Sequence, residues 1–185
     1  MKRIETIKAP KILLCSIKGD DIDDALLAQD RSIYQDHYEN IIEYKAEGVI
    51  DFYRFTQSKA FDIVHLFVKL EPGGTAEKQP VSHILRHLAM QDVKLVIFAR
   101  NNSSEARQGF RRSMMFGIKI NFIVVLDRKG ESFSRFFREL FGLVASGMSF
   151  LMAWVKLAPQ TEGPWMENLP RTYGVTDRGD LKFIP

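Results

Sequence analysis

The chain has 185 residues, of which 45% are apolar and 26% charged, and its formal net charge is +3. This length suits one domain with a sizeable core, so we expect residues 1–185 to form a single domain. The charge is too small to indicate a nucleic-acid-binding protein, which needs a concentrated basic face. A single cysteine, Cys15, excludes an internal disulfide. No segment resembles a signal peptide or a membrane span, so we expect a cytoplasmic protein without membrane contact.

The first elements are predicted from apolar spacing. An apolar run at residues 11–17 predicts a strand with Cys15 buried in it. Apolar residues at helical spacing then predict one long helix over about 20–48. Residues 49–55 predict a second strand, and its charged residues place it toward the edge of the sheet, partly in contact with solvent.

Two near-continuous apolar segments form the centre of the predicted sheet, residues 61–69 and residues 94–100. Pro80 suits the first turn of a helix that ends before Val93 and joins them. Further elements are predicted in order: a helix over 103–117, a strand over 120–126, helices over 131–145 and 149–157, and a short edge strand over 183–185.

Strands that are buried on both faces have near-continuous apolar sequences, and strands that alternate with helices form parallel sheets. The predicted fold class is therefore α/β. We expect a three-layer sandwich in which helices flank a mainly parallel sheet of about five or six strands.

Open parallel sheets bind ligands beyond the carboxyl ends of their strands. In this chain, polar residues occupy or follow three predicted strands, and we take them as a candidate pocket: His65, Lys69, Arg100, Asn101, Asn102, Asp127 and Arg128. A strand-end lysine and asparagine are not the usual nucleophiles or proton shuttles. The sequence therefore points to a pocket without naming its chemistry.

Two groups of side chains could form a metal site, and we predict a metal at neither. Asp20, Asp21, Asp23 and Asp24 could join Asp127 around a divalent cation, but capping of a helix explains the first four as well. His83 and His87 are four residues apart on one helix, but the glutamate of the zinc-hydrolase motif does not follow the first histidine. We predict no metal and no cofactor.

Other polar groups admit two interpretations. The loop over 71–76 could present backbone N–H groups to a phosphate, but it lacks the glycine spacing and the lysine of a P-loop. Ser103 and Ser104 suit the start of a helix better than a nucleophile. A set of basic residues could bind a nucleotide or an acidic protein, or could be a solvated helix surface: Arg107, Arg111, Arg112, Arg128, Lys129, Arg135 and Arg138.

Four segments resemble the caspase-like CHAT domains. Residues 61–69 are similar to the third strand of that family, where a pattern of the kind D-V-x-H-x-x-x-H-G ends in the catalytic histidine, and residues 95–103 are similar to its fourth strand, L-V-x-L-x-A-C-x-S, with the nucleophilic cysteine. Residues 114–126 resemble the following helix and strand. Residues 133–157 resemble the pattern F-x-x-x-F-Y-x-x-L followed by G-x-S-x-x-x-A.

The resemblance covers about residues 11–158 and leaves 159–185 as a tail packed on the domain. It aligns Lys69 with the catalytic histidine of the family and Asn101 with its cysteine, while His65 matches an earlier, usually non-catalytic histidine. Neither an ammonium nor an amide can replace a thiolate and imidazole pair in acyl transfer. The resemblance therefore implies a protease-like domain without its catalytic dyad.

Two functions follow as expectations. The first is a non-catalytic caspase-like domain that binds a protein partner or regulates an assembly, with no enzyme activity. The alternative is an α/β domain that binds a nucleotide or another phosphorylated small molecule at the carboxyl edge of the sheet, through Lys69, Arg100, Asn101 and Arg128.

Overall fold

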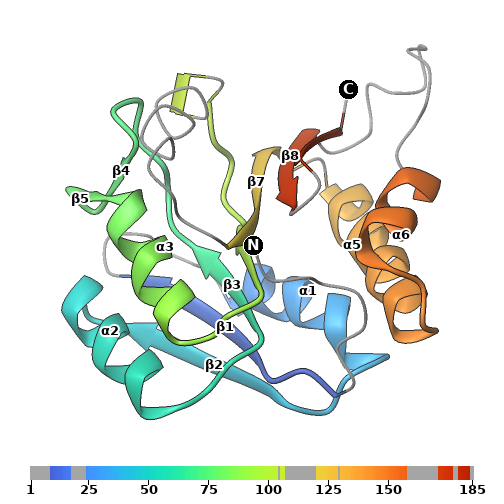
Figure 1. Cartoon of the computed structure of the whole chain (residues 1–185), viewed down its shortest axis with the longest axis horizontal. Coiled ribbons are helices and arrows are strands. Elements are labelled where there is room, and N and C mark those ends of the chain that lie inside the picture. Colours follow the sequence, from blue (N-terminus) through green and yellow to red (C-terminus); the bar gives the residue numbers. More distant parts are fainter. Residues whose placement is uncertain are drawn as a thin grey trace.

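Figure 1 shows the computed structural model of the chain. It describes residues 9–17, 24–103, 105–106, 120–128, 130–157, 171–176 and 179–183, and all structural statements below refer to these residues. They form an α/β structure in which helices cover both faces of a central sheet, as the sequence predicted.

The central sheet has seven strands in the order β2-β1-β3-β6-β7-β8-β9. The first five in this order are parallel, and β8 and β9 extend the sheet in antiparallel pairing. The strands are β1 (Ile12–Ile17), β2 (Ile41–Ala46), β3 (Ile63–Phe67), β6 (Leu95–Phe98), β7 (Asn121–Asp127), β8 (Arg171–Thr176) and β9 (Gly179–Phe183). A separate two-stranded hairpin is formed by β4 (Thr75–Ala76) and β5 (Gln79–Pro80).

Helices cover the two faces of the sheet in separate groups. The helices are α1 (Asp24–Gln35), α2 (Val49–Ser58), α3 (Val81–Met90), α5 (Gly130–Ala145) and α6 (Phe150–Leu157). The apolar residues of α2 and α3 share one core cluster, and those of α1, α5 and α6 share the other. Figure 1 shows α2 and α3 together on one side of the sheet and α5 beside α6. This arrangement is a three-layer sandwich.

Alternation along each strand divides the core between the two faces. In β1, Leu13 and Cys15 face the α2/α3 layer, whereas Ile12 and Leu14 face the α1/α5 layer. All four side chains are fully buried. Burial on both faces explains why β1, β3 and β6 appear in the sequence as nearly continuous apolar runs, interrupted by Ser16 in β1 and His65 in β3.

The prediction for residues 20–55 was wrong in two places. Helix α1 ends at Gln35 instead of continuing to Gly48, and residues 41–46 form the edge strand β2. The predicted strand over 49–55 is part of helix α2, which runs from Val49 to Ser58.

The physical reason lies in the spacing of buried groups. Phe52 and Thr56 are buried and lie one helical turn apart, so the aromatic residues of this segment form one face of a helix. The Asp51 carboxylate at the start of α2 accepts hydrogen bonds from the Glu47 N–H at 3.0 Å and the Tyr44 hydroxyl at 2.8 Å, and these bonds link the helix to β2. The abundance of aromatic residues, which favours strands in general, was therefore misleading here.

Most later predictions are confirmed. The strands predicted at 62–69, 94–100 and 120–126 correspond to β3, β6 and β7, and the helices predicted after Pro80 and over 131–145 and 149–157 correspond to α3, α5 and α6. Strand β8 was not predicted, and the predicted edge strand over 183–185 meets β9 only at Phe183, since residues 184 and 185 lie outside the described residues. Most of the predicted helix over 103–117 and most of the tail before β8 lie outside the described residues.

Candidate functional site

A pocket lies at the carboxyl ends of the central strands. Its volume is about 520 Å³, and it is lined by Leu26, Gln29, Lys69, Arg100, Asn101 and Arg128. The last four residues belong to the pocket that the sequence predicted at this edge. They come from the segments that follow β3, β6 and β7, and α1 supplies the first two. The tertiary structure therefore brings together residues from four separate parts of the chain.

The pocket lies where the order of the strands reverses. Strand β1 lies between β2 and β3, and the chain leaves β1 and β3 toward helices on opposite faces of the sheet, α1 and α3. Loops that diverge in this way leave a crevice, which is where open α/β sheets bind their ligands. The positions of Lys69 and Gln29 in the pocket wall agree with this rule.

Asn102 lies beneath the pocket and connects three of its segments. Its side chain is buried; its Oδ1 accepts the Leu70 N–H at 2.8 Å, and its Nδ2 donates to the carbonyls of Arg100 at 2.6 Å and Val125 at 2.9 Å. These bonds satisfy backbone groups at the exits of β3, β6 and β7. Asn102 therefore has a structural role, and it does not line the pocket as the sequence analysis expected.

Arg128 is held rigidly by its side chain and its backbone. Its Nη1 and Nη2 atoms donate to the Asp30 carboxylate at 2.7 and 2.5 Å, and Nη1 also donates to the Ala99 carbonyl at 2.9 Å. The guanidinium carbon lies 4.0 Å from the centre of the Phe133 ring, a cation–π contact. The Arg128 N–H donates to Asn101 Oδ1 at 2.7 Å. The Asp30 carboxylate balances the positive charge of Arg128. Arg128 therefore contributes to the shape of the pocket wall and adds little net charge to it.

His65 belongs to the same buried network and lies away from the pocket surface. Its Nε2 lies 2.7 Å from Asp30 Oδ2, and its Nδ1 lies 2.8 Å from the Tyr34 hydroxyl. Asp30, Tyr34 and His65 are all fully buried. An ionised Asp30 can only accept, so the Nε2 atom of His65 carries the proton in this contact. His65 is therefore a buried link between β3 and α1, and the sequence analysis was wrong to place it in the pocket.

Burial and charge act in opposite directions on Asp30. Burial alone would raise the pKa of its carboxyl, but the charge and hydrogen bond of His65, together with the hydrogen bonds and charge of Arg128, outweigh it and lower the pKa below its usual range. The carboxylate is therefore ionised at neutral pH and remains paired with the arginine.

Asp30, Tyr34 and Gln29 were not recognised from the sequence. All three lie on α1, and Asp30 and Tyr34 belong to its buried face with Ile33. An aspartate in the apolar stripe of a helix is a signal that a buried cation is nearby, because buried charges are paired. The sequence contains this signal, but the residue that pairs with it is 98 positions away.

The other predicted site residues lie elsewhere in the described structure or outside the described residues. The backbone of Asp127 ends β7, and its side chain lies outside the described part of the structure. Of the basic set, Arg135 and Arg138 lie on α5 and line a separate groove, whereas Arg107, Arg111, Arg112 and Lys129 lie outside the described residues. Ser103 accepts the Ala106 N–H at 3.0 Å, as a helix-capping serine does, and Ser104 is not described.

The two metal hypotheses have little support among the described residues. Asp24 is exposed and bonds the Lys45 ammonium at 3.2 Å, and Asp20, Asp21 and Asp23 are not described. His87 bonds the Thr56 hydroxyl at 2.8 Å and packs against the Tyr53 ring, while His83 is exposed. In the described part of the chain, no three acidic, histidine or cysteine side chains form a group that could hold a metal ion.

Cys15 lies in β1, the strand next to edge strand β2, and does not line the pocket. Its side chain is fully buried, and burial, with a smaller effect of the Asp51 charge, raises the pKa of the thiol to about 12. A thiol of this kind is a poor nucleophile at neutral pH, because the reactive species is the thiolate. Cys15 therefore behaves as a small apolar core residue.

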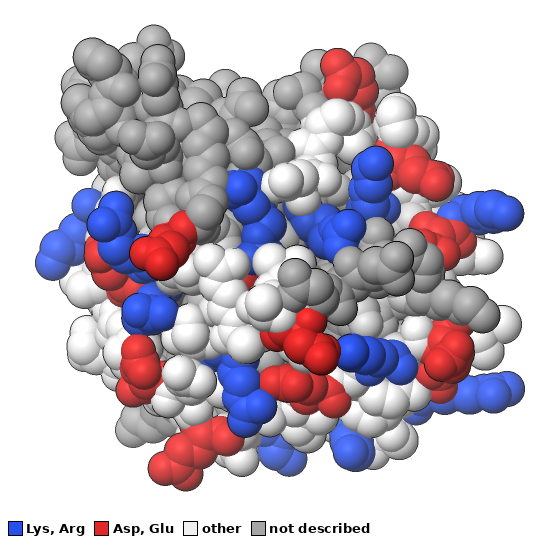
Figure 2. Space-filling view, turned by 180° about the vertical axis from the view of Figure 1, so that it is seen from behind, with Lys and Arg blue, Asp and Glu red and all other residues white. Residues whose placement is uncertain are grey.

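The surface charge is mixed. Figure 2, a view from behind, shows blue and red side chains interspersed over the lower half and several blue side chains together in the middle of the upper half. On this face, the described residues form no continuous basic surface. Among the described helices, none has both the length and the hydrophobicity needed to cross a membrane.

Comparisons with known proteins do not assign this chain to a family. No protein-family model matches this chain, and no curated protein is significantly similar to it. The resemblance to caspase-like CHAT domains therefore stays a prediction. Function has to be inferred from the pocket and from the side chains that line it.

Proposed function

We propose that this domain binds a small phosphorylated molecule in the pocket at the carboxyl ends of β3, β6 and β7. The observation that carries the proposal is the convergence of Lys69, Arg100 and Asn101 on one pocket. Its volume of about 520 Å³ lies within the range of roughly 300–1,000 Å³ that is typical of small-molecule sites.

The charge of the pocket favours an anion. Arg128 is paired with Asp30, and Lys69 and Arg100 are the other cationic side chains of the wall. Both cations are good donors to phosphate oxygens, and the six residues of the wall include no carboxylate. The composition of the lining, cationic and without a carboxylate, therefore favours a phosphate over a cationic group.

Asn101 is oriented to add a neutral donor. Its Oδ1 atom accepts the Arg128 N–H at 2.7 Å, which fixes the orientation of the amide group. With the oxygen engaged in this way, the Nδ2 atom is the part of the side chain that can donate to a ligand. The side chain is exposed at the pocket wall, so a ligand reaches it without a rearrangement of the core.

A non-catalytic caspase-like domain is the second candidate, and one observation favours it. Lys69 and Asn101, the two positions that the resemblance aligns with the catalytic histidine and cysteine, line the same pocket. A lysine and an amide do not support thiol-dependent acyl transfer. On this reading the pocket holds an acidic group of a protein partner instead of a substrate.

The test is a thermal-shift titration of the purified chain with inorganic phosphate, pyrophosphate and a panel of nucleotides. A ligand that binds only the folded state at a hundred times its Kd stabilises it by about 2.7 kcal/mol. We expect at least one of these compounds to raise the melting temperature. Lys69→Ala and Asn101→Ala should each weaken that binding at least fivefold.

The matched control is Lys156→Ala, which removes one positive charge from an exposed position on α6, outside the pocket. It should bind like the unaltered protein. If no phosphorylated compound shifts the melting temperature, the small-molecule proposal is wrong. A protein partner that is recovered from pull-down with the unaltered chain, and lost with Lys69→Ala and Asn101→Ala, would then support the caspase-like interaction domain.

A further inference from the structure

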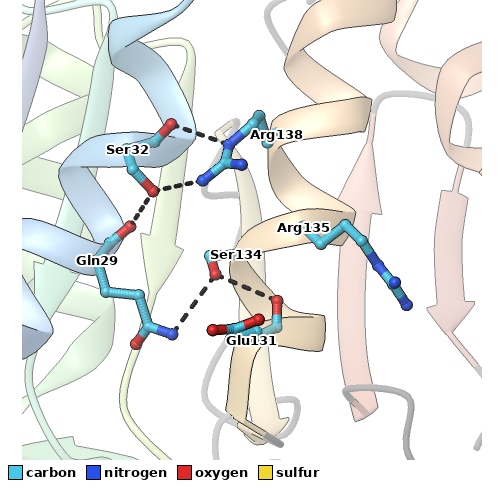
Figure 3. A pocket seen from close by; sticks show the side chains of 6 residues that line it. All are labelled: Gln29, Ser32, Glu131, Ser134, Arg135 and Arg138. Atoms are coloured by element: carbon cyan, nitrogen blue, oxygen red, sulfur yellow. Dashed lines mark hydrogen bonds between the residues drawn. The ribbon is translucent and has the colours of Figure 1, made fainter.

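A second cavity adjoins the pocket between α1 and α5. It has a volume of about 410 Å³ and is lined by Gln29, Ser32, Glu131, Ser134, Arg135 and Arg138 (Figure 3). We call it the α1/α5 groove. Gln29 lines both this groove and the strand-end pocket, so the two cavities meet at one side chain. The groove is therefore next to the strand-end pocket, beside the Gln29 side chain.

Two arginines of α5 line the groove. Arg138 is directed at α1, where its Nη2 donates to Ser32 Oγ at 2.8 Å and its Nε donates to the Ser32 carbonyl at 3.3 Å. It also lies 3.6 Å from an Asp36 carboxylate oxygen, so its charge is partly balanced. In Figure 3, the side chain of Arg135 points away from Gln29 and Ser134. Neither arginine is aimed at a ligand in the centre of the groove.

The other lining side chains are Gln29, Ser32, Ser134 and Glu131. All four can form hydrogen bonds, and Glu131 alone among them carries a negative charge. Ser134 is buried, and its hydroxyl donates to the Glu131 carbonyl at 3.2 Å and accepts from Gln29 Nε2 at 3.5 Å. The Gln29 contact is at the long limit of a hydrogen bond, so exchanging it for a bond to a ligand costs little. The exposed Glu131 carboxylate points toward α1 in Figure 3.

The lining of the groove favours one of two chemical groups that a ligand could place there, a second phosphate or a sugar. A second phosphate would approach the Glu131 carboxylate, while Arg138 is engaged by Ser32 and Asp36 and Arg135 points away from Gln29 and Ser134, and this is unfavourable. Sugar hydroxyl groups both donate and accept, so they can bond the carboxylate, the amide and the serine hydroxyls together. The chemistry of the groove therefore matches a polyhydroxyl group.

We propose that the ligand is a phosphorylated sugar, either a sugar phosphate or a nucleotide, whose phosphate lies in the strand-end pocket and whose sugar hydroxyls lie in the α1/α5 groove against Gln29, Ser134 and Glu131. This inference rests on the proposed function of the strand-end pocket, because it concerns the sugar of a ligand whose phosphate the pocket holds.

The experiment is isothermal titration calorimetry of the full chain with inorganic phosphate, ribose 5-phosphate, glucose 6-phosphate and AMP. We expect at least one of the three phosphorylated sugars to bind at least tenfold tighter than inorganic phosphate. Glu131→Ala should lower that ratio at least fivefold. Glu139→Ala is the matched control, because it removes the same charge from an exposed position of the same helix, outside the groove, and it should keep the ratio within twofold.

The outcomes separate the two proposals. If inorganic phosphate binds and none of the phosphorylated sugars gains tenfold, the groove does not hold a sugar and only the further inference is overturned. The same conclusion follows if Glu131→Ala and Glu139→Ala change the ratio equally. If neither phosphate nor any phosphorylated sugar binds, the proposed function of the pocket fails as well. Circular dichroism of both variants checks that α5 remains folded.

Discussion

The carboxylate of Asp30 and the guanidinium of Arg128 form a two-pronged ion pair that links α1 to the end of β7. Asp30 Oδ2 accepts from Nη1 at 2.7 Å and Oδ1 accepts from Nη2 at 2.5 Å. The aspartate side chain is fully buried and the arginine side chain is 9% exposed. This pair positions Arg128 at the wall of the pocket and removes most of its charge from the binding surface.

Replacing Asp30 by asparagine should destabilise the protein strongly. Asp30→Asn leaves the buried Arg128 cation without its counter-charge, and breaking a buried pair in this way typically costs about 3–5 kcal/mol. Urea denaturation measures the free energy of unfolding. The control is Asp24→Asn, because Asp24 is 91% exposed and its pair with Lys45 should contribute less than about 1 kcal/mol. Equal losses for the two variants would show that the buried pair has no special role.

The stability provided by Asp30 should depend on pH in the acid range. Its folded-state pKa lies below the ordinary value of 3.8, so the unfolded chain binds a proton more readily than the folded one. The contribution of Asp30 is therefore complete well above pH 3.8 and is lost as the pH falls through the folded pKa. We expect the difference in unfolding free energy between the unaltered protein and Asp30→Asn to be smaller at pH 3 than at pH 7. A larger difference at pH 3 would contradict the lowered pKa.

Cys15 should be unreactive in the folded protein. Its thiol is buried and its pKa is raised to about 12, so the thiolate is scarce at pH 8 and reagents do not reach it. A chromogenic disulfide reagent should titrate no thiol in the native protein and one thiol after unfolding in urea. Fast labelling of the native protein would mean that β1 opens or that the thiol is exposed.

The same shift has a consequence at high pH. Because the folded pKa of Cys15 is above its ordinary value of 9.0, its contribution is complete below pH 9 and is lost as the pH rises through about 12. Burial also raises the pKa of Tyr34 and Tyr38, so the same direction applies to them. Cys15→Ala should lose less stability between pH 9 and pH 11 than the unaltered protein. The two tyrosines serve as an internal reference, because they are present in both proteins.

Asn101 and Asn102 are adjacent, but their substitutions should have different effects. Asn102→Ala removes three hydrogen bonds from buried backbone groups and should cost about 1–3 kcal/mol of unfolding free energy. Asn101→Ala removes one bond at an exposed position and should cost less than half as much, while it weakens phosphate binding. Chemical denaturation and calorimetry measure the two effects. If both variants lost stability equally, Asn102 would not be the link between the strand exits.

Part of the fold was predictable because buried strands and helices have characteristic apolar patterns in the sequence. Strands β3 and β6 are covered on both faces, so their apolar runs are nearly continuous and were found at nearly the right positions. Helix α5 places its apolar residues on one stripe and was found for the same reason. Edge strand β2 is only partly buried, and its weaker pattern was taken for the end of a helix.

Part of the site was predictable from topology alone. The rule that ligands bind beyond the carboxyl ends of parallel strands directed attention to Lys69, Arg100, Asn101 and Arg128, which line one pocket. The same rule could not separate side chains that face the pocket from those that face the core. His65 and Asn102 were therefore placed with the pocket residues although both are buried.

By itself, the sequence determined the α/β class, the central strands and the edge of the sheet where the candidate pocket lies, because these depend on local apolar patterns and on the handedness of strand connections. Only the tertiary structure decided that Asp30 pairs with Arg128, and that Gln29 joins the strand-end pocket to the α1/α5 groove. The physical reason is distance along the chain. A salt bridge between residues 98 positions apart leaves no local pattern, since the contact exists only after α1 has packed against the sheet and α5.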